Sequence, residues 1–243
     1  MTQLQTTSAI APEPGLPARV GGVIFSPRAT YAAVAARPRV GGVLAIVLAV
    51  CAVSLFVFLS TDVGQQATID QQVRQMEAFG RPLNDAQYAR LEQMAPYSRY
   101  FGAGFQLVTL PLAALIVAGI AFAVFNAVLG GEATFKQAYA IVAHSGVIIA
   151  AQQIFALPLA YARESLSGST NLAVFFPFLD ENTFAARMLG AIDLFLVWWI
   201  VSLAIGFGVL YRRRTGPIAT ALLLIYASIG LIIAAIKTAI SGV

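Results

Sequence analysis

The sequence predicts an all-α membrane protein: a polytopic bundle of five transmembrane helices with a short cytoplasmic interfacial helix and an extramembrane helical hairpin. Hydrophobic residues make up 59% of the 243 positions and charged residues 11%, whereas soluble domains carry about 25% charged residues. The mean hydropathy is +0.80. A surface this poor in charge is stable against lipid rather than water. We therefore expect residues 21–243 to form a membrane domain and residues 1–20 a flexible polar tail.

Five apolar stretches are each long enough to cross the hydrocarbon core, which takes about 20 residues of helix. They cover about residues 40–61, 102–129, 137–159, 188–210 and 217–236, and Asp193 in the fourth is the one Asp, Glu, Lys or Arg within them. Because hydrocarbon offers the backbone no hydrogen-bond partner, each stretch is predicted to be a helix that satisfies its own N–H and C=O groups.

Two segments outside these stretches are also predicted to be helical. Ser26 suits an N-cap, Pro27 the first helical position and Pro38 a stop, which gives a helix of about ten residues at the cytoplasmic interface. The polar segment of residues 64–97 is interrupted at residues 80–82 and has apolar residues at helical spacing on either side. It is predicted to form a helical hairpin outside the membrane.

The basic residues predict the orientation, because Arg and Lys near the ends of spans favour the cytoplasmic side. Four arginines precede the first stretch, and Arg212, Arg213 and Arg214 precede the fifth. We therefore expect a cytoplasmic N-terminus and an external C-terminus. The preference for Arg over Lys and the abundance of Ala are typical of a GC-rich bacterial genome, which predicts a location in the bacterial inner membrane.

Asp193 is the strongest candidate for a functional side chain, because a carboxylate at membrane depth is costly unless it faces the bundle interior or water. Its position, about six residues into the fourth stretch, corresponds to roughly 9 Å below the outer boundary. Gln152, Gln153 and Gln106 lie at a similar predicted depth. This polar site could couple a proton or a cation, or it could be an interhelical hydrogen bond that fixes the packing, which is the commoner case.

His144, the only histidine, defines a second candidate cluster with Asn126 and Tyr226, closer to the cytoplasmic side. Ser145 is its neighbour in sequence, yet consecutive residues of a helix point about 100° apart and do not face each other. A Ser–His catalytic dyad is therefore not predicted, and we expect no enzymatic activity.

Other classes of site lack support in the sequence. One cysteine, Cys51, and one histidine cannot build a metal site, no phosphate-binding glycine loop is present, and no basic stripe is dense enough for nucleic acid. We expect no metal, no cofactor and no nucleic-acid partner. The run Arg212-Arg213-Arg214 is the candidate for contact with anionic lipid, at about 1 kcal/mol per charge near a membrane surface.

Four short motifs occur in order between about residues 22 and 237. They are Ile24-Phe25-Ser26-Pro27-Arg28, Gly130-Gly131-Glu132-Ala133-Thr134-Phe135-Lys136-Gln137-Ala138, Val142-Ala143-His144-Ser145, and Asp193-Leu194-Phe195 followed by Trp198 and Ile205-Gly206. In this order they resemble the Yip family (Ypt-interacting proteins) of five-span membrane proteins, in its bacterial branch. The resemblance implies a cytosolic N-terminus. Eukaryotic relatives associate with small GTPases and vesicle membranes, but this sequence lacks their long acidic tail, so the resemblance implies no GTPase partner.

These observations favour a non-enzymatic scaffold or adaptor that binds other membrane proteins, including further copies of itself, or organises lipid in the bilayer. The alternative is a transporter or channel component, such as the accessory subunit of an exporter, that uses the polar site near Asp193. A water-filled cavity reaching Asp193 would favour the transporter. A dry bundle with Asp193 bonded to Gln152 or Gln153 would favour the scaffold.

Overall fold

The computed structural model describes residues 14–241 except 167, 169, 177 and 180–182. This described part is built from helices, with one isolated β-bridge between Asn171 and Asp193, which confirms the all-α prediction. The elements are α1 (Leu16–Phe25), α2 (Pro27–Ala36), α3 (Gly41–Leu59), α4 (Asp62–Ala78), α5 (Asp85–Met94), η1 (Ala95–Tyr97), α6 (Ser98–Phe122), η2 (Ala123–Val128), α7 (Phe135–Ala162), η3 (Leu172–Phe175), α8 (Phe184–Gly190), α9 (Leu194–Leu210) and α10 (Thr215–Ser241).

Four helical segments among the described residues are long and apolar enough to cross a membrane: Gly41–Leu59, Asp85–Val128, Phe135–Ala162 and Thr215–Ile236. They coincide with four of the five predicted stretches and support a multi-pass membrane protein. The remaining apolar helix, α9, has 17 residues. At 1.5 Å per residue it is about 26 Å long, which is short of a hydrocarbon core of about 30 Å.

The fourth predicted stretch, residues 188–210, is not one continuous helix, because α8 ends at Gly190 and α9 begins at Leu194. Asp193 between them has an extended backbone, with φ −89° and ψ 128°, and its carboxylate accepts a hydrogen bond from the Leu196 N–H. Asp is among the strongest helix N-caps. Asp193, which the sequence predicts about six residues inside a helix, therefore lies at the start of one.

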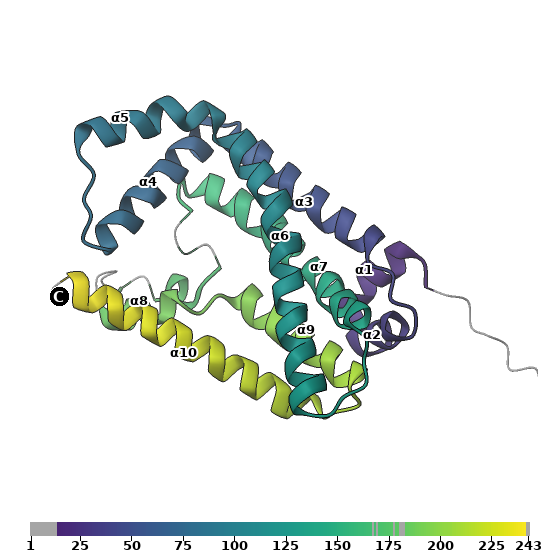
Figure 1. Ribbon diagram of the computed structural model, residues 1–243. Coiled ribbons are helices and arrows are strands. Elements are labelled where there is room, and N and C mark those ends of the chain that lie inside the picture. Colours follow the sequence, from purple (N-terminus) through teal and green to yellow (C-terminus); the bar gives the residue numbers. More distant parts are fainter. Residues whose placement is uncertain (1–13, 167, 169, 177, 180–182, 242–243) are drawn as a thin grey trace, which may run out of the picture.

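Helix α7 is the centre of the bundle: it packs against α3, α6 and α9, and also against the short helices α1 and α2 (Figure 1). Of its most apolar 18 residues 56% are buried, against 6% for α10. Gly206 lets α9 approach α7 closely, because a Cβ at this position would lie 2.4 Å from the Ile141 Cγ2 atom. Small residues at such crossings are how membrane helices gain packing contact.

Helix α2 begins at Pro27, as the sequence predicts, and packs onto the bundle rather than standing away from it. Tyr31 and Val34, which share one face of the helix, have no exposed surface. The Tyr31 hydroxyl lies 2.6 Å from Ser202 Oγ on α9, and both groups are buried. This hydrogen bond attaches α2 to a helix 171 positions further along the chain.

Helix α1 begins at Leu16, inside the segment of residues 1–20 that the sequence predicts to be a tail. Residues 1–13 lie outside the described part. Gly22 allows α1 to pack against α2, because a Cβ there would lie 2.2 Å from Thr30 Oγ1. Leu16 packs over Gly42 at the start of α3. Its Cδ2 atom lies 3.1 Å from the position that a Cβ of residue 42 would take.

The segment predicted as a hairpin contains two helices, α4 and α5, at the end of the bundle opposite α1 and α2 (Figure 1). Thr61 caps α4 with its side chain, and Asn84 and Gln87 form a capping box at the start of α5. Gln66 of α4 donates a hydrogen bond to the hydroxyl of Tyr88 on α5, at 3.3 Å. Helix α5 continues through η1 into α6, so the hairpin is joined directly to two membrane helices.

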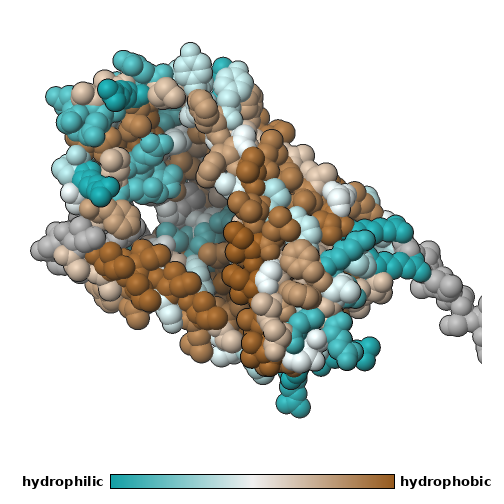
Figure 2. All heavy atoms as spheres, in the orientation of Figure 1, coloured by the Kyte–Doolittle hydropathy of each residue, from teal (hydrophilic) through white to brown (hydrophobic). Residues whose placement is uncertain are grey.

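Hydrophobic side chains cover the visible faces of α6 and α10, and Figure 2 shows a hollow between them in which hydrophilic residues are visible. Only 11% of the most apolar 18 residues of the segment that contains α6 are buried, and 6% of those of α10. Helix α10 packs against α9 and α8 and makes a small contact with α4. Few residues of either helix are therefore fully buried, and both helices expose apolar side chains.

The close approach of α9 to α7 can be tested with Gly206→Ala. The added methyl must displace Ile141, so we expect a loss of about 1–3 kcal/mol in the free energy of unfolding and a lower melting temperature in detergent. Gly119→Ala on α6 is the matched control, because nothing lies within 4 Å of its added Cβ. Equal melting temperatures for the two variants would contradict the packing described here.

Candidate functional site

Asp193 is the meeting point of four segments of the chain. Its Oδ2 atom accepts hydrogen bonds from Gln152 Nε2 on α7, at 3.0 Å, and from the hydroxyl of Thr170 in the loop that follows α7. Its Oδ1 atom accepts from the Leu196 N–H, at 2.9 Å. Both carboxylate oxygens are therefore satisfied, which offsets the cost of placing this group away from bulk water.

The backbone around Asp193 is bonded as well. Across the isolated bridge, the Leu172 N–H donates to Ile192 O at 2.9 Å and the Leu194 N–H to Thr170 O at 3.0 Å. The Asp193 N–H donates to the hydroxyl of Tyr226 on α10, at 2.9 Å, and that hydroxyl donates to Ala191 O, at 2.7 Å. The groups freed by the break between α8 and α9 are thus paired by the loop and by α10. We refer to Asp193, Gln152, Thr170 and Tyr226 as the Asp193 node.

A pocket of about 240 Å³ lies beside this node. Asn171 contributes a side chain that donates from Nδ2 to Gly190 O, at 3.1 Å, while its buried Oδ1 atom has no hydrogen-bond partner among the described residues. The pocket therefore has a polar wall with one free acceptor and an apolar wall from α7. Its lining residues are Gln152, Ala156, Leu157, Ala160, Leu166, Gly168, Thr170, Asn171, Gly190 and Asp193.

The structure brings together part of the predicted site. Gln152 is bonded to Asp193, but no hydrogen bond joins Gln153 or Gln106 to Asp193 within the described residues. Gln153 is adjacent to Gln152 and points about 100° away from it on the same helix. Gln106 lies on α6, and its Oε1 atom is buried with no partner in the described part of the chain.

The second predicted cluster does not form, because its three members lie in different places. His144 is fully buried on α7, and its Nδ1–H donates to Ala140 O, at 2.8 Å. Asn126 in η2 donates to Ala133 O, at 2.7 Å, which closes the loop before α7. Tyr226 belongs to the Asp193 node. The three residues were grouped by predicted depth alone, and equal depth on different helices does not bring side chains into contact.

The predicted lipid-contacting arginines lie in the turn between α9 and α10. The turn is fixed by the Arg213 N–H, which donates to Gly208 O at 2.9 Å, and by Arg212 in the left-handed region, with φ 52°. The Arg213 guanidinium donates to Leu129 O, at 3.0 Å. A cavity of about 660 Å³ at this turn is lined by Arg28, Gly208, Val209, Arg212, Arg213, Arg214, Thr215 and Gly216. The sequence predicts Arg28, on α2, on the same cytoplasmic side as these arginines, but it does not predict that they share a cavity.

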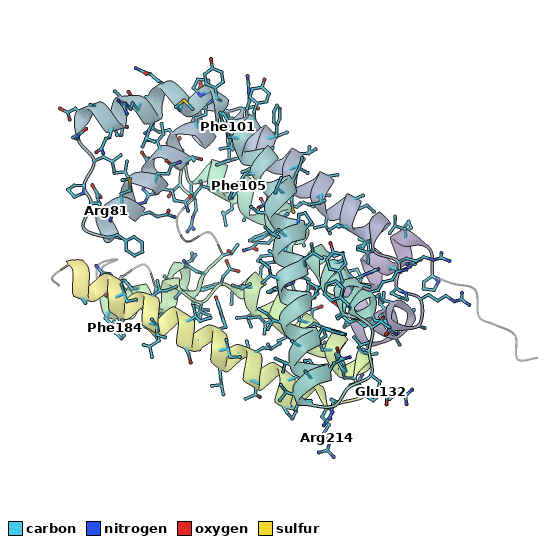
Figure 3. The ribbon with its side chains drawn as sticks, viewed as in Figure 1. Arg81, Phe101, Phe105, Glu132, Phe184 and Arg214 are labelled. Carbon is cyan, nitrogen blue, oxygen red and sulfur yellow. The ribbon has the colours of Figure 1, made fainter. Side chains whose placement is uncertain are left out.

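A second cavity, of about 380 Å³, shares two of these arginines. Tyr211 stacks on Phe125 in its wall, with ring centroids 4.6 Å apart, and burial raises the pKa of its phenol. A Cβ at Gly131 would lie 2.6 Å from the Tyr211 ring, so this position needs glycine. The lining is Phe125, Gly130, Gly131, Glu132, Ala133, Gln137, Leu210, Tyr211, Arg212 and Arg213. Figure 3 shows Glu132 and Arg214 at this same end of the molecule.

Comparison with known proteins identifies the family. The model of the Yip1 domain matches residues 21–236, from α1 to α10. The chain belongs to the Yip1 domain family. No curated protein and no solved structure matches it. Three of the four motifs seen in the sequence lie at joints of the fold: residues 24–28 connect α1 to α2, residues 130–138 lead into α7, and Asp193 begins α9. The remaining motif, residues 142–145, lies within α7.

Proposed function

We propose that this Yip1 protein is a non-enzymatic scaffold or adaptor of the bacterial inner membrane that binds other membrane proteins. The observation that carries the proposal is the contrast between its interior and its periphery. The carboxylate of Asp193 is fully hydrogen-bonded within the chain, so its observed geometry joins helices rather than presenting a reactive group. The faces of α6 and α10, in contrast, expose apolar side chains outside the packed interior.

The proposed topology has five crossings, with α9 as the fourth. Helix α9 is about 26 Å long by its 17 residues. The bridge between Asn171 and Asp193, with its two backbone hydrogen bonds, extends the path of α9 toward the external side. The arginines at α1, α2 and the turn before α10 lie at the end of the bundle opposite the hairpin (Figure 1). The positive-inside rule favours this end as the cytoplasmic one, which leaves the hairpin and the C-terminus outside.

The partner surface in this proposal is formed by the exposed faces of α6 and α10. Ile116 on α6 is 55% exposed and Ile225 on α10 is 58% exposed. A second copy of this chain is one such partner.

Photocrosslinking in native membranes tests the partner surface. With p-benzoylphenylalanine at position 116 or 225, we expect discrete crosslinked protein adducts, because partner helices pack on these faces. The same probe at Val57 on α3, which is 59% exposed, is the matched control and should give weaker adducts. Lipid adducts alone at positions 116 and 225 would contradict the scaffold proposal.

The pocket beside Asp193 favours a second candidate function, that of a transporter or channel component. Asp193 and Asn171 both line this 240 Å³ space. A transported polar solute or ion would need water to reach this space, whereas a scaffold needs none.

Cysteine labelling distinguishes the two functions. In a Cys51→Ala background, Ala156→Cys places a thiol in the pocket, and a membrane-impermeant maleimide reports whether water reaches it. The scaffold proposal predicts no labelling during the time in which an exposed hairpin cysteine, Gln75→Cys, reacts completely. Labelling at position 156, with the buried control Ala118→Cys unreactive, would favour the transporter.

A further inference from the structure

We propose that Arg28 and the arginines of the α9–α10 turn form a binding site for a phosphate group, carried by a lipid headgroup or free in solution. We call the four side chains, Arg28, Arg212, Arg213 and Arg214, the arginine cradle. The site is separate from the partner surface on α6 and α10, so it does not depend on the scaffold role.

The fold brings the cradle together from two distant parts of the chain. Arg28 is the second residue of α2, and α2 packs against α9 through the Tyr31–Ser202 hydrogen bond. This contact places Arg28 on the same cavity as Arg212, which lies 184 positions later in the sequence. Four arginines therefore line one cavity of about 660 Å³. Ligand pockets commonly have about 300–1,000 Å³, so a headgroup can be accommodated.

Few acidic groups of the described residues lie near the cradle. None of them lines the cavity itself, and Glu132 lines the neighbouring cavity that Arg212 and Arg213 share. Among the described residues, Arg28, Arg212 and Arg214 have no ion pair or side-chain hydrogen bond, and Arg213 donates only to Leu129 O. Four like charges at one cavity repel one another, and an anion that carries more than one negative charge relieves this repulsion. An ion with several acceptor oxygens is the natural counterpart.

The backbone of the turn prepares the cavity for such an anion. Gly208 allows the turn to close tightly, because a Cβ there would lie 3.0 Å from Thr215 Oγ1 and 3.2 Å from Arg213 O. Thr215 and Gly216, at the start of the 27-residue helix α10, also line the cavity. The first N–H groups of a helix lack intrahelical partners, and they add to the positive potential that the guanidinium groups create.

The side-chain chemistry favours phosphate over other anions. Arginine presents a planar fork of donors that matches two phosphate oxygens, and such charge-assisted pairs are about twice as strong as neutral hydrogen bonds. No aromatic side chain lines the cavity, so a nucleotide base would have no stacking partner. The recognised unit is therefore the phosphate itself, which a phosphomonoester lipid such as phosphatidic acid displays at the membrane surface.

The test is a binding titration on the full chain purified in a neutral detergent, with dihexanoyl phosphatidic acid as the lipid probe and inorganic phosphate as the free anion. We expect Arg28→Gln to weaken binding of the lipid probe about tenfold and Arg28→Lys to be intermediate, because lysine keeps the charge and loses the fork. Arg214→Gln is the second variant should Arg28→Gln fail to fold. Arg90→Gln, an exposed arginine of the hairpin with the same change of charge, is the matched control and should bind as the wild type does.

The two arms of the titration separate the sources of the phosphate group. If inorganic phosphate displaces the lipid probe at millimolar concentration, the site accepts the free anion; if it does not, the site requires the lipid headgroup. Either result supports the arginine cradle if Arg28→Gln binds the lipid probe more weakly than the wild type and Arg90→Gln binds it equally well. Unchanged binding in Arg28→Gln, or an equal loss in Arg90→Gln, would overturn the proposal and leave only general attraction between charges.

Discussion

The arrangement of the C-terminal half of the bundle depends on the hydrogen-bonded carboxylate of Asp193. A carboxylate far from bulk water must be paired, and here Gln152, Thr170 and the Leu196 N–H supply the donors. These bonds join α7 to the loop that follows it and to the start of α9. Tyr226 adds α10 through the backbone of the same residue. Asp193 thus connects three helices that have few polar groups. One further polar contact joins α7 and α9, where Trp199 Nε1 donates to Ser145 Oγ at 2.9 Å.

Much of the fold could be predicted from the sequence, because the constraint on membrane helices is severe. Uncharged runs of sufficient length marked α3, α6, α7 and α10, and Ser26, Pro27 and Pro38 marked α2. The break before α9 could not be predicted from hydropathy, since the residues on both sides are apolar. The one signal of the break was Asp193 itself. An isolated Asp between apolar residues is typical of a helix N-cap as well as of a buried charge.

The candidate sites were predictable only in part. Gln152 and Asp193 were predicted to pair from their matched depth along the helices, and the hydrogen bond between them confirms that pairing. Thr170 and Tyr226 were missed at this node because a loop and a helix break, rather than helix depth, bring them to Asp193. Arg28 was missed at the arginine turn for a related reason: its approach to Arg212 depends on how α2 packs on α9, which a one-dimensional pattern does not contain.

Asp193 connects α7 to the start of α9 through its hydrogen bonds, and a double-mutant cycle measures that role directly. Unfolding free energies of Gln152→Ala, Asp193→Ala and the double variant, measured in mixed micelles, give the coupling between the two side chains regardless of how each single change affects stability. We expect a coupling of about 1–3 kcal/mol, in the range for a hydrogen bond to a charged group. Free energies that add to within about 0.3 kcal/mol would show that the two side chains do not hold α7 and α9 together.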